Sequence, residues 1–162
     1  MKIIGIDPGL RVSGYGVVEA SGRELRVLDA GVVRADSALP MPQRLDQIYQ
    51  DFDGLLSEHE PETVAIEELY AHFKHPRTAV MMGHARGAIL LAAAQHMIPV
   101  EEYAATRIKK SLTGYGRASK EQMQRAITTQ LQLAQLPEPA DVADALAIAL
   151  CCYSENKIKS LK

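Results

Sequence analysis

The chain opens with a short apolar run that ends in an acidic residue and then turns at once. Residues 2–6 are rich in β-branched side chains, which predicts a buried strand, and Asp7 is followed directly by Pro8-Gly9. An ionised carboxylate at the end of a buried strand is costly unless something pairs with it. This arrangement indicates a metal or phosphate site. The alternative is that Asp7 only shapes the Pro-Gly turn, as Asp often does.

The rest of the chain alternates between strand-like and helix-like patterns. Strands are predicted over residues 14–19, 25–33, 63–67 and 99–103, and helices over residues 42–59, 77–97, 106–112, 119–133 and 140–154. The first three strands are joined by short turns, which predicts an antiparallel meander, whereas the later strands alternate with helices and are expected to be parallel. We therefore expect an α/β fold with a mixed five-stranded sheet flanked by helices, in a single domain over residues 1–162.

The composition is that of an ordinary globular protein. Hydrophobic residues make up 47% of the chain, and no stretch is long and apolar enough to cross a membrane. The sequence begins directly with a strand pattern, so we expect no signal peptide. Cys151 and Cys152 are adjacent in an apolar helical pattern, which fits a reducing compartment. These features predict a cytoplasmic protein.

The charge distribution favours a nucleic-acid partner more than the net charge does. The net charge of −2 is unusual for a phosphate binder. Between residues 106 and 125, however, only Glu121 is acidic, and the basic residues there are Arg107, Lys109, Lys110, Arg117, Lys120 and Arg125. Such a positive stripe could follow a phosphate backbone. Its lysines could equally be ordinary solvated helix faces.

Carboxylates recur at positions that could meet. Asp7 ends the first strand, Glu67 ends the fourth, and Asp141 and Asp144 share one face of the last helix. If the first and fourth strands are parallel neighbours, their carboxyl ends open on one edge of the sheet, where open α/β sheets bind ligands. Four hard oxygen donors suit Mg²⁺ or Mn²⁺. Two such ions, about 3.5–4 Å apart, would support in-line attack on a phosphodiester.

Each carboxylate also has a simpler explanation. Asp141 and Asp144 follow Pro139 in the first turns of a helix, where acids stabilise the helix dipole. Glu67 could be an exposed strand end. The convergence of all four residues favours a metal site over these separate explanations.

Five motifs in this order resemble the bacterial Holliday junction resolvases of the RuvC family. They are I-G-I-D-P-G at Ile4–Gly9, A-I-E-E at Ala65–Glu68, G-H-A-R-G at Gly83–Gly87, E-Y-A-A at Glu102–Ala105 and A-D-V-A-D-A-L-A at Ala140–Ala147. The resemblance covers nearly the whole chain. It departs most from the family pattern over residues 71–82.

This resemblance implies an RNase H-like fold, a homodimer and Mg²⁺-dependent paired nicking of four-way DNA junctions, with two ions per site and Mn²⁺ as a substitute. It also implies the RuvA–RuvB branch-migration complex as a partner. The matching motifs place the family's catalytic and metal-binding acids on Asp7, Glu67, Asp141 and Asp144, and its basic DNA contacts on Lys109 and Lys120. The stacking aromatic falls on Tyr70, with Phe73 as a rival and a core-covering role as the alternative.

Other functions are compatible with parts of the pattern. A sugar-kinase or actin-like ATPase also has Asp and Gly after its first strand, but it needs two such domains around its nucleotide. A related nuclease that processes structured RNA, or a binding module without catalysis, would share most features. The presence of all four carboxylates argues against lost catalysis. The small residues of the helix over residues 77–97 make it the candidate dimer interface, or else they only pack on the sheet.

Overall fold

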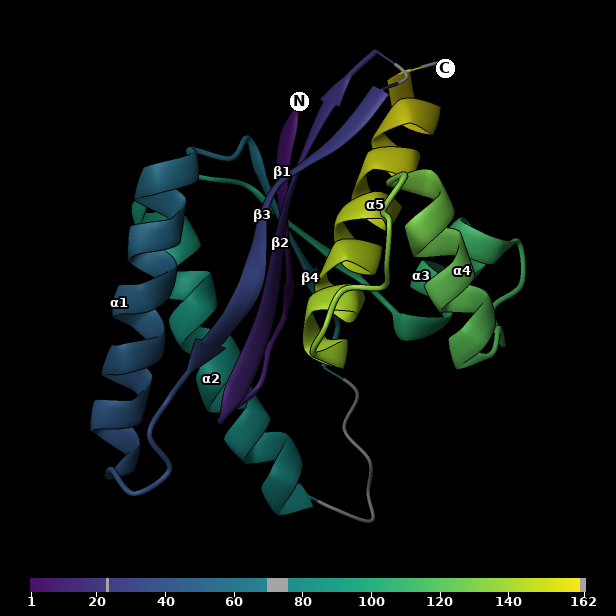
Figure 1. Ribbon diagram of the computed structural model, residues 1–162. Helices are drawn as coiled ribbons and strands as arrows, with labels where there is room; N and C mark the ends of the chain where they lie inside the picture. The colour runs from purple at the N-terminus through teal and green to yellow at the C-terminus, as the bar shows by residue number, and fades with distance from the viewer. Residues whose placement is uncertain (23, 70–75, 161–162) are drawn as a thin grey trace.

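The computed structural model describes residues 1–22, 24–69 and 76–160 of the chain. Five strands and five helices are found in these ranges (Figure 1). In chain order they are β1 (Lys2–Asp7), β2 (Val12–Ser21), β3 (Glu24–Arg34), α1 (Met41–His59), β4 (Thr63–Glu67), α2 (Pro76–Gln95), β5 (Val100–Tyr103), α3 (Ala105–Thr113), α4 (Lys120–Gln130) and α5 (Ala140–Ser160).

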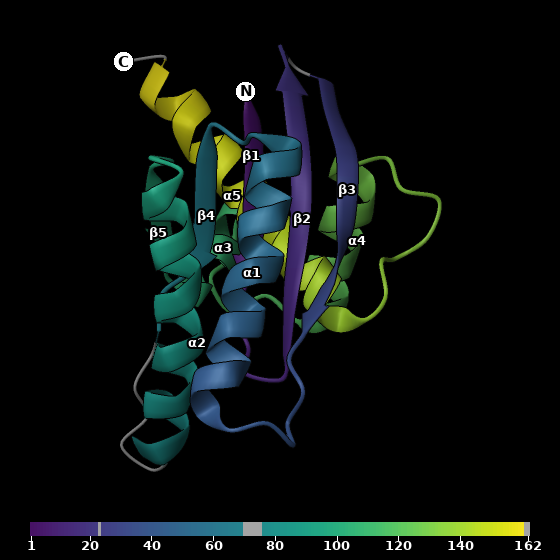
Figure 2. The same ribbon diagram turned by 90° about the vertical axis from the view of Figure 1, so that its left-hand side faces the viewer.

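The strands form one mixed sheet in the order β3-β2-β1-β4-β5, seen from the α1 and α2 side in Figure 2. β1, β2 and β3 pair antiparallel, whereas β4 pairs parallel with both β1 and β5. Gly22 lies in the turn between β2 and β3 with φ of 64°, in the left-handed region that glycine adopts without steric cost. The predicted meander followed by parallel strands is confirmed.

Helices cover both faces of the sheet. α1 and α2 lie on one face, and α3, α4 and α5 lie on the other (Figure 1). Side chains alternate along β1, so Ile4 and Ile6 join the core beneath α1 and α2, whereas Ile3 joins the core beneath α5. The even residues of β1 thus face α1 and α2. The odd residues, which include Asp7, face α5.

Glycines on β1 and β2 let α5 lie unusually close to the sheet. An added Cβ at Gly5 would come within 2.1 Å of the Ala145 carbonyl oxygen, and one at Gly14 within 2.0 Å of the Asp141 carbonyl oxygen. Gly5 is also directly opposite Gly16 in the β1–β2 ladder. The backbone of α5 occupies the space that side chains would fill, so its N-terminal turn is held next to the end of β1.

Two predicted helix ends differ from the structure. α5 continues to Ser160, six residues beyond the predicted end, and Lys159 in its last turn bonds Glu101 of β5 at 3.1 Å. α4 ends at Gln130, before the predicted end, because the chain reverses at Gln132 with φ of 51°. No helix within the described ranges is long and apolar enough to cross a membrane.

Candidate active site

Asp7 is held at the end of β1 by a well-bonded turn. Ser13 of β2 is buried, its Oγ accepts a hydrogen bond from the Gly9 N–H at 3.0 Å, and it donates one to the Gly9 carbonyl at 2.8 Å. Arg44 of α1 donates to the Leu10 carbonyl at 2.9 Å from the other side of the sheet. These bonds fix where the chain leaves β1, and with it the position of Asp7.

Glu67 ends the neighbouring parallel strand at the same level. The last paired residues of β1 and β4 are Ile6 and Ile66, so Asp7 and Glu67 are one position further along their strands. Parallel neighbours in register present their side chains on the same face. Both carboxylates therefore lie on the α5 side, at the carboxyl edge of the sheet.

The N-terminal turns of α5 bring the other two acids to this edge. The helix begins at Ala140, so Asp141 lies in its first turn and Asp144 one turn later. Asp144 contributes to the wall of the same cleft as Asp7 and Glu67. Asp141 does not line this cleft, and its carbonyl group packs on Gly14.

This cleft has a volume of about 410 Å³ and is built from β1, β4, α3, α4 and α5. Its lining residues are Asp7, Glu67, Ala105, Ile108, Lys109, Ala118, Lys120, Met123, Asp144, Ala147 and Ile148. Lys120 is the first residue of α4, which starts at a capping box in which Ser119 and Gln122 bond each other's backbone N–H groups. The helix that this capping box starts therefore places a lysine in the lining of an acidic cleft.

The crowded carboxylates perturb one another. Burial, and then the charges of Asp144, Glu67 and Asp141, raise the pKa of Asp7 to about 7. Burial and the charge of Asp144 raise the pKa of Glu67, and the positive charge of Lys109 opposes this shift. A divalent cation bound among these carboxylates would offset the repulsion between them.

The donor set of the cleft fits a hard divalent cation that is completed by its substrate. Within residues 1–22, 24–69 and 76–160, no three His, Cys, Asp or Glu side chains stand close enough to hold a metal ion by themselves. Mg²⁺ does not require such a cage, because one or two carboxylates, water and substrate phosphates commonly suffice. The carboxylates that line the cleft are Asp7, Glu67 and Asp144, and they would be the protein's ligands in such a site.

The basic residues that were predicted to form one stripe lie in separate places in the structure. Lys109 and Lys120 line the acidic cleft, whereas Arg107 and Lys110 line a separate hollow between α3 and α5. Residues two apart on a helix do not face the same way, which separates Arg107 from Lys109. The Nη2 atom of Arg107 bonds the Oε2 atom of Glu155 at 2.6 Å. Arg117 is exposed in the loop before α4.

Two predicted aromatics cannot be placed, and one basic residue was missed. Tyr70 and Phe73 lie outside the described residues. Arg86 of α2 contacts Glu102, and its Nε atom donates to the Glu67 carbonyl at 3.4 Å. The motif containing Arg86 was visible in the sequence, but the sequence carried no sign that α2 brings it to the end of β4.

Comparison with known proteins agrees with this geometry. A family model described as "Crossover junction endodeoxyribonuclease RuvC" matches residues 3–152. Proteins of that name from Rhodopirellula baltica and Alkaliphilus oremlandii are 48% and 45% identical, over 92% and 93% of this chain and 84% and 92% of their own. The structure also matches Thermus thermophilus RuvC in complex with Holliday junction substrate, with a TM-score of 0.93, 34% identity and coverage of 99% of this chain and 97% of that chain. This chain therefore has the RNase H-like fold and belongs to the RuvC family of crossover junction endodeoxyribonucleases.

Proposed function

We propose that this protein is a Mg²⁺-dependent endonuclease that resolves four-way DNA junctions by paired symmetric nicks, in recombination and DNA repair. The single observation that supports this most is that Asp7, Glu67 and Asp144 line the same cleft as Lys109 and Lys120. Acids that bind cations beside bases that bind phosphates match a site for a phosphodiester backbone. Its RuvC relative was solved with a Holliday junction, which supports this choice of substrate.

In this proposal the four carboxylates Asp7, Glu67, Asp141 and Asp144 hold two Mg²⁺ ions, and Mn²⁺ substitutes for them. The bound metal would supply an activated water and stabilise the charge that develops on the leaving oxygen. Asp7 contributes most directly because it is the most enclosed of the acids that perturb one another. Asp141 does not line the cleft, and its charge helps to raise the pKa of Asp144.

Lys109 and Lys120 bind the phosphates that flank the scissile bond. They come from different helices. Burial and the charge of Asp141 raise the pKa of Asp144, and the positive charges of both lysines oppose this shift. The positive charges of both lysines would offset the charge of a phosphate bound in the cleft. Arg107, Lys110 and Arg117 do not line the cleft and would bind a more distant part of the DNA.

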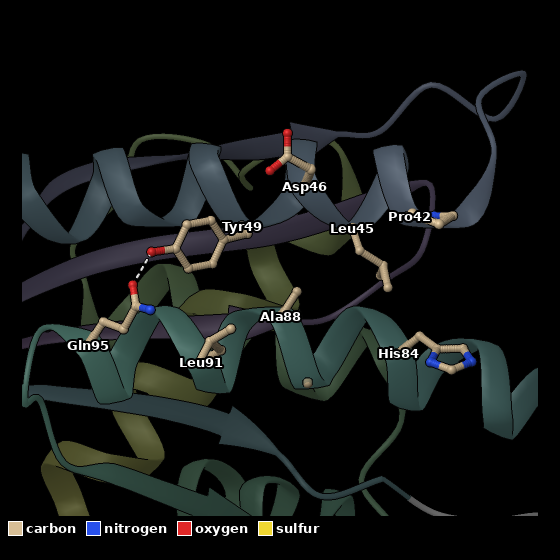
Figure 3. Close-up of a pocket in the computed structure, with 9 residues that line it drawn as sticks. Pro42, Leu45, Asp46, Tyr49, His84, Ala88, Leu91 and Gln95 are labelled. Atoms are coloured by element: carbon tan, nitrogen blue, oxygen red, sulfur yellow. Dashed lines mark hydrogen bonds between the residues drawn. The ribbon is translucent and has the colours of Figure 1, made fainter.

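The two nicks require two active sites, so we propose a homodimer whose symmetry matches that of the junction. A groove of about 570 Å³ runs between α1 and α2 on the face opposite the cleft, and Figure 3 shows its side chains. Its lining residues are Pro42, Leu45, Asp46, Tyr49, His84, Gly87, Ala88, Leu91 and Gln95.

The chemistry of this groove supports the dimer. Leu91 is 53% exposed although it is a large apolar side chain, and the small Gly87 and Ala88 beside it would allow a second helix to approach closely. Tyr49 donates a hydrogen bond to Gln95 across the groove, which ties α1 to α2 (Figure 3). A second copy of α2 is the occupant that we propose.

We further infer a cytoplasmic location and the RuvA–RuvB branch-migration complex as a partner. The location rests on the two free cysteines, which are buried in α5. The partner rests on membership of the family alone.

Cleavage of a synthetic four-way junction tests the proposed function. Each strand is labelled in turn and incubated with Mg²⁺ or with EDTA, beside a linear duplex and a structured RNA of equal length. The expected result is Mg²⁺-dependent nicks at symmetric positions in two opposing strands of the junction only. Cleavage of the RNA in preference to the junction would support the alternative nuclease, and no Mg²⁺-dependent cleavage would overturn the proposal.

A further inference from the structure

Two of the sequence motifs meet at the end of β4. Arg86 belongs to G-H-A-R-G in α2, and Glu102 belongs to E-Y-A-A in β5. The Nη2 atom of Arg86 and the Oε2 atom of Glu102 are 2.6 Å apart, which is the length of a strong charge-assisted hydrogen bond. Only 11% of the Arg86 side chain is exposed.

The same guanidinium reaches the backbone of Glu67. Its Nε atom donates to the Glu67 carbonyl oxygen at 3.4 Å, a long hydrogen bond from a charged donor. Arg86 therefore bridges a carboxylate on β5 and the main chain of β4 at the residue whose side chain enters the acidic cleft.

The Glu67 carbonyl needs this donor because β1 cannot supply one. Val64 and Glu68 donate to carbonyls on the β5 side, at Pro99 and Tyr103, so even-numbered residues of β4 face β5. Odd-numbered residues, which include Glu67, face β1 by alternation. The next donor in register on β1 would be residue 8, and Pro8 has no N–H.

We propose that Arg86 is a positioning residue for the Glu67 carboxylate: with Glu102 it replaces the ladder hydrogen bond that Pro8 cannot make and so fixes the end of β4. The Pro8-Gly9 turn that brings Asp7 to the cleft thus leaves the last carbonyl of β4 without its ladder hydrogen bond. A donor from α2 takes the place of the missing N–H. This inference rests on the proposed function, because it concerns the residue that would hold the metal there.

The test uses two conservative variants, Arg86→Lys and Glu102→Gln, in the full-length protein. Lysine keeps the charge but lacks the planar fork that bonds two acceptors at once. Removing a group that orients a metal ligand typically weakens metal binding by about 10–100-fold. We expect the dissociation constant for Mn²⁺, measured by electron paramagnetic resonance without DNA, to rise by at least about 10-fold in Arg86→Lys. The Mg²⁺ concentration for half-maximal junction cleavage should rise by a similar factor, and excess Mg²⁺ should restore most of the rate.

Glu155→Gln is the matched control, since it breaks another Arg–Glu pair of 2.6 Å, with Arg107, away from the carboxylate cleft. Its Mn²⁺ affinity and Mg²⁺ midpoint should equal those of the wild type. A loss of stability alone would lower the maximal cleavage rate. It would not change the Mn²⁺ dissociation constant or the Mg²⁺ concentration for half-maximal cleavage. The inference would be overturned if both Arg86→Lys and Glu102→Gln kept the wild-type Mn²⁺ dissociation constant and Mg²⁺ midpoint of cleavage. Equal changes of these two quantities in Glu155→Gln would also overturn it.

Glu67→Gln separates this inference from the proposed function. If Glu67→Gln cleaves junctions as well as the wild type does, Glu67 is no metal ligand, and the proposed role of the cleft fails first. If Glu67→Gln is inactive while both Arg86→Lys and Glu102→Gln bind Mn²⁺ normally, the proposed function stands and the positioning role of Arg86 is wrong.

Discussion

Asp7 lies among three other carboxylates, at a place where the fold also removes much of its contact with water. The ionised form of such a group is destabilised, because the buried charge is repelled by its neighbours. The turn bonds to Ser13 and Arg44 explain how the chain maintains this arrangement. A position that is costly in the free protein and favourable with a cation is what a metal ligand requires.

The pH dependence of stability tests this view of Asp7. Its pKa is raised from the ordinary value of 3.8 to about 7, so the folded metal-free protein holds the proton more tightly than the unfolded chain does. The stabilisation from protonated Asp7 is therefore complete below about pH 4 and is lost as the pH rises through about 7. In EDTA, Asp7→Asn should be more stable than the wild type at pH 8, and this advantage should shrink at pH 5.

Urea unfolding of both proteins at the two pH values measures this difference. Groups outside the cleft titrate equally in the wild type and the variant, so the change in their difference reports on Asp7 and the acids coupled to it. A difference that is the same at pH 5 and pH 8 would show that the Asp7 pKa is not raised.

Lys109 and Lys120 provide a test of phosphate binding. Replacing either by Ala should weaken junction binding and reduce the slope of log K against log[salt] by about 1, because one fewer phosphate is neutralised. Folding stability should change by no more than about 0.5 kcal/mol, as is usual for surface positions. Binding titrations from low to high salt check this, and unaltered affinity and slope in both variants would make these lysines ordinary solvated side chains.

The positions of the acidic residues in the fold were more predictable from the sequence than those of the basic residues. Asp7 and Glu67 follow predictable strands, so their meeting at one sheet edge was foreseeable. Arg107 and Lys109 were grouped by proximity along the chain, although residues two apart on a helix point apart. The position of Arg86 could not be predicted from the sequence, because its contact with Glu67 depends on how α2 packs across the strand ends.

At the scale of elements, the approach of α5 to the sheet decides whether the site forms. The helix carries Asp141 and Asp144 and rests on glycines that leave room for its backbone. The sequence suggested the strands that contain these glycines, but not that a helix backbone would occupy the space above them. The extended end of α5 was missed for a similar reason, since its contact with Glu101 is tertiary.

Gly14→Ala should displace the first turn of α5. Its Cβ would come within 2.0 Å of the Asp141 carbonyl oxygen, and that backbone cannot move freely. Overpacking of this kind costs about 1–3 kcal/mol, and cleavage should fall more than stability alone explains, because the acids move with the helix.

Gly54→Ala is the control for this prediction. Gly54 lies in α1, and nothing stands within 4 Å of its added Cβ, so alanine should stabilise the helix by about 0.5–1 kcal/mol. Denaturant unfolding and junction cleavage of the two variants give the comparison. A Gly14→Ala protein as stable and active as the wild type would show that the glycine is not needed for the seating of α5.

At the scale of the whole molecule, the sheet separates two functions. The acidic cleft is lined partly by α3, α4 and α5, and the other groove by α1 and α2. These two groups of helices lie on opposite faces of the sheet (Figure 1). The mixed sheet flanked by helices was predicted correctly from the hydrophobic patterns and the lengths of the connections between strands. Which helix faces stay exposed was not predictable, because small residues such as those of α2 serve equally to pack on a sheet or to meet a partner.

Leu91→Glu should convert the proposed dimer to a folded monomer. A charge on the groove would be buried without a partner in the dimer but solvated in the monomer. Ile158→Glu is the control, because Ile158 is also 53% exposed but lies at the far end of α5. Sedimentation at micromolar concentration should show a monomer for Leu91→Glu and a dimer for Ile158→Glu and the wild type. A strictly monomeric wild type that makes paired nicks would rule out the dimer.

Asp7→Asn separates cleavage of the junction by the carboxylate cleft from binding of the junction by the rest of the surface. Asn keeps the shape of Asp and suits the Pro8-Gly9 turn, but it removes a hard anionic ligand. One preparation is assayed for junction binding by gel shift in EDTA and for cleavage with Mg²⁺. Cleavage should fall by about 1000-fold or more, while binding persists or tightens because a negative charge near the phosphates is gone. Near-normal cleavage by Asp7→Asn would contradict the account and make Asp7 only a turn residue.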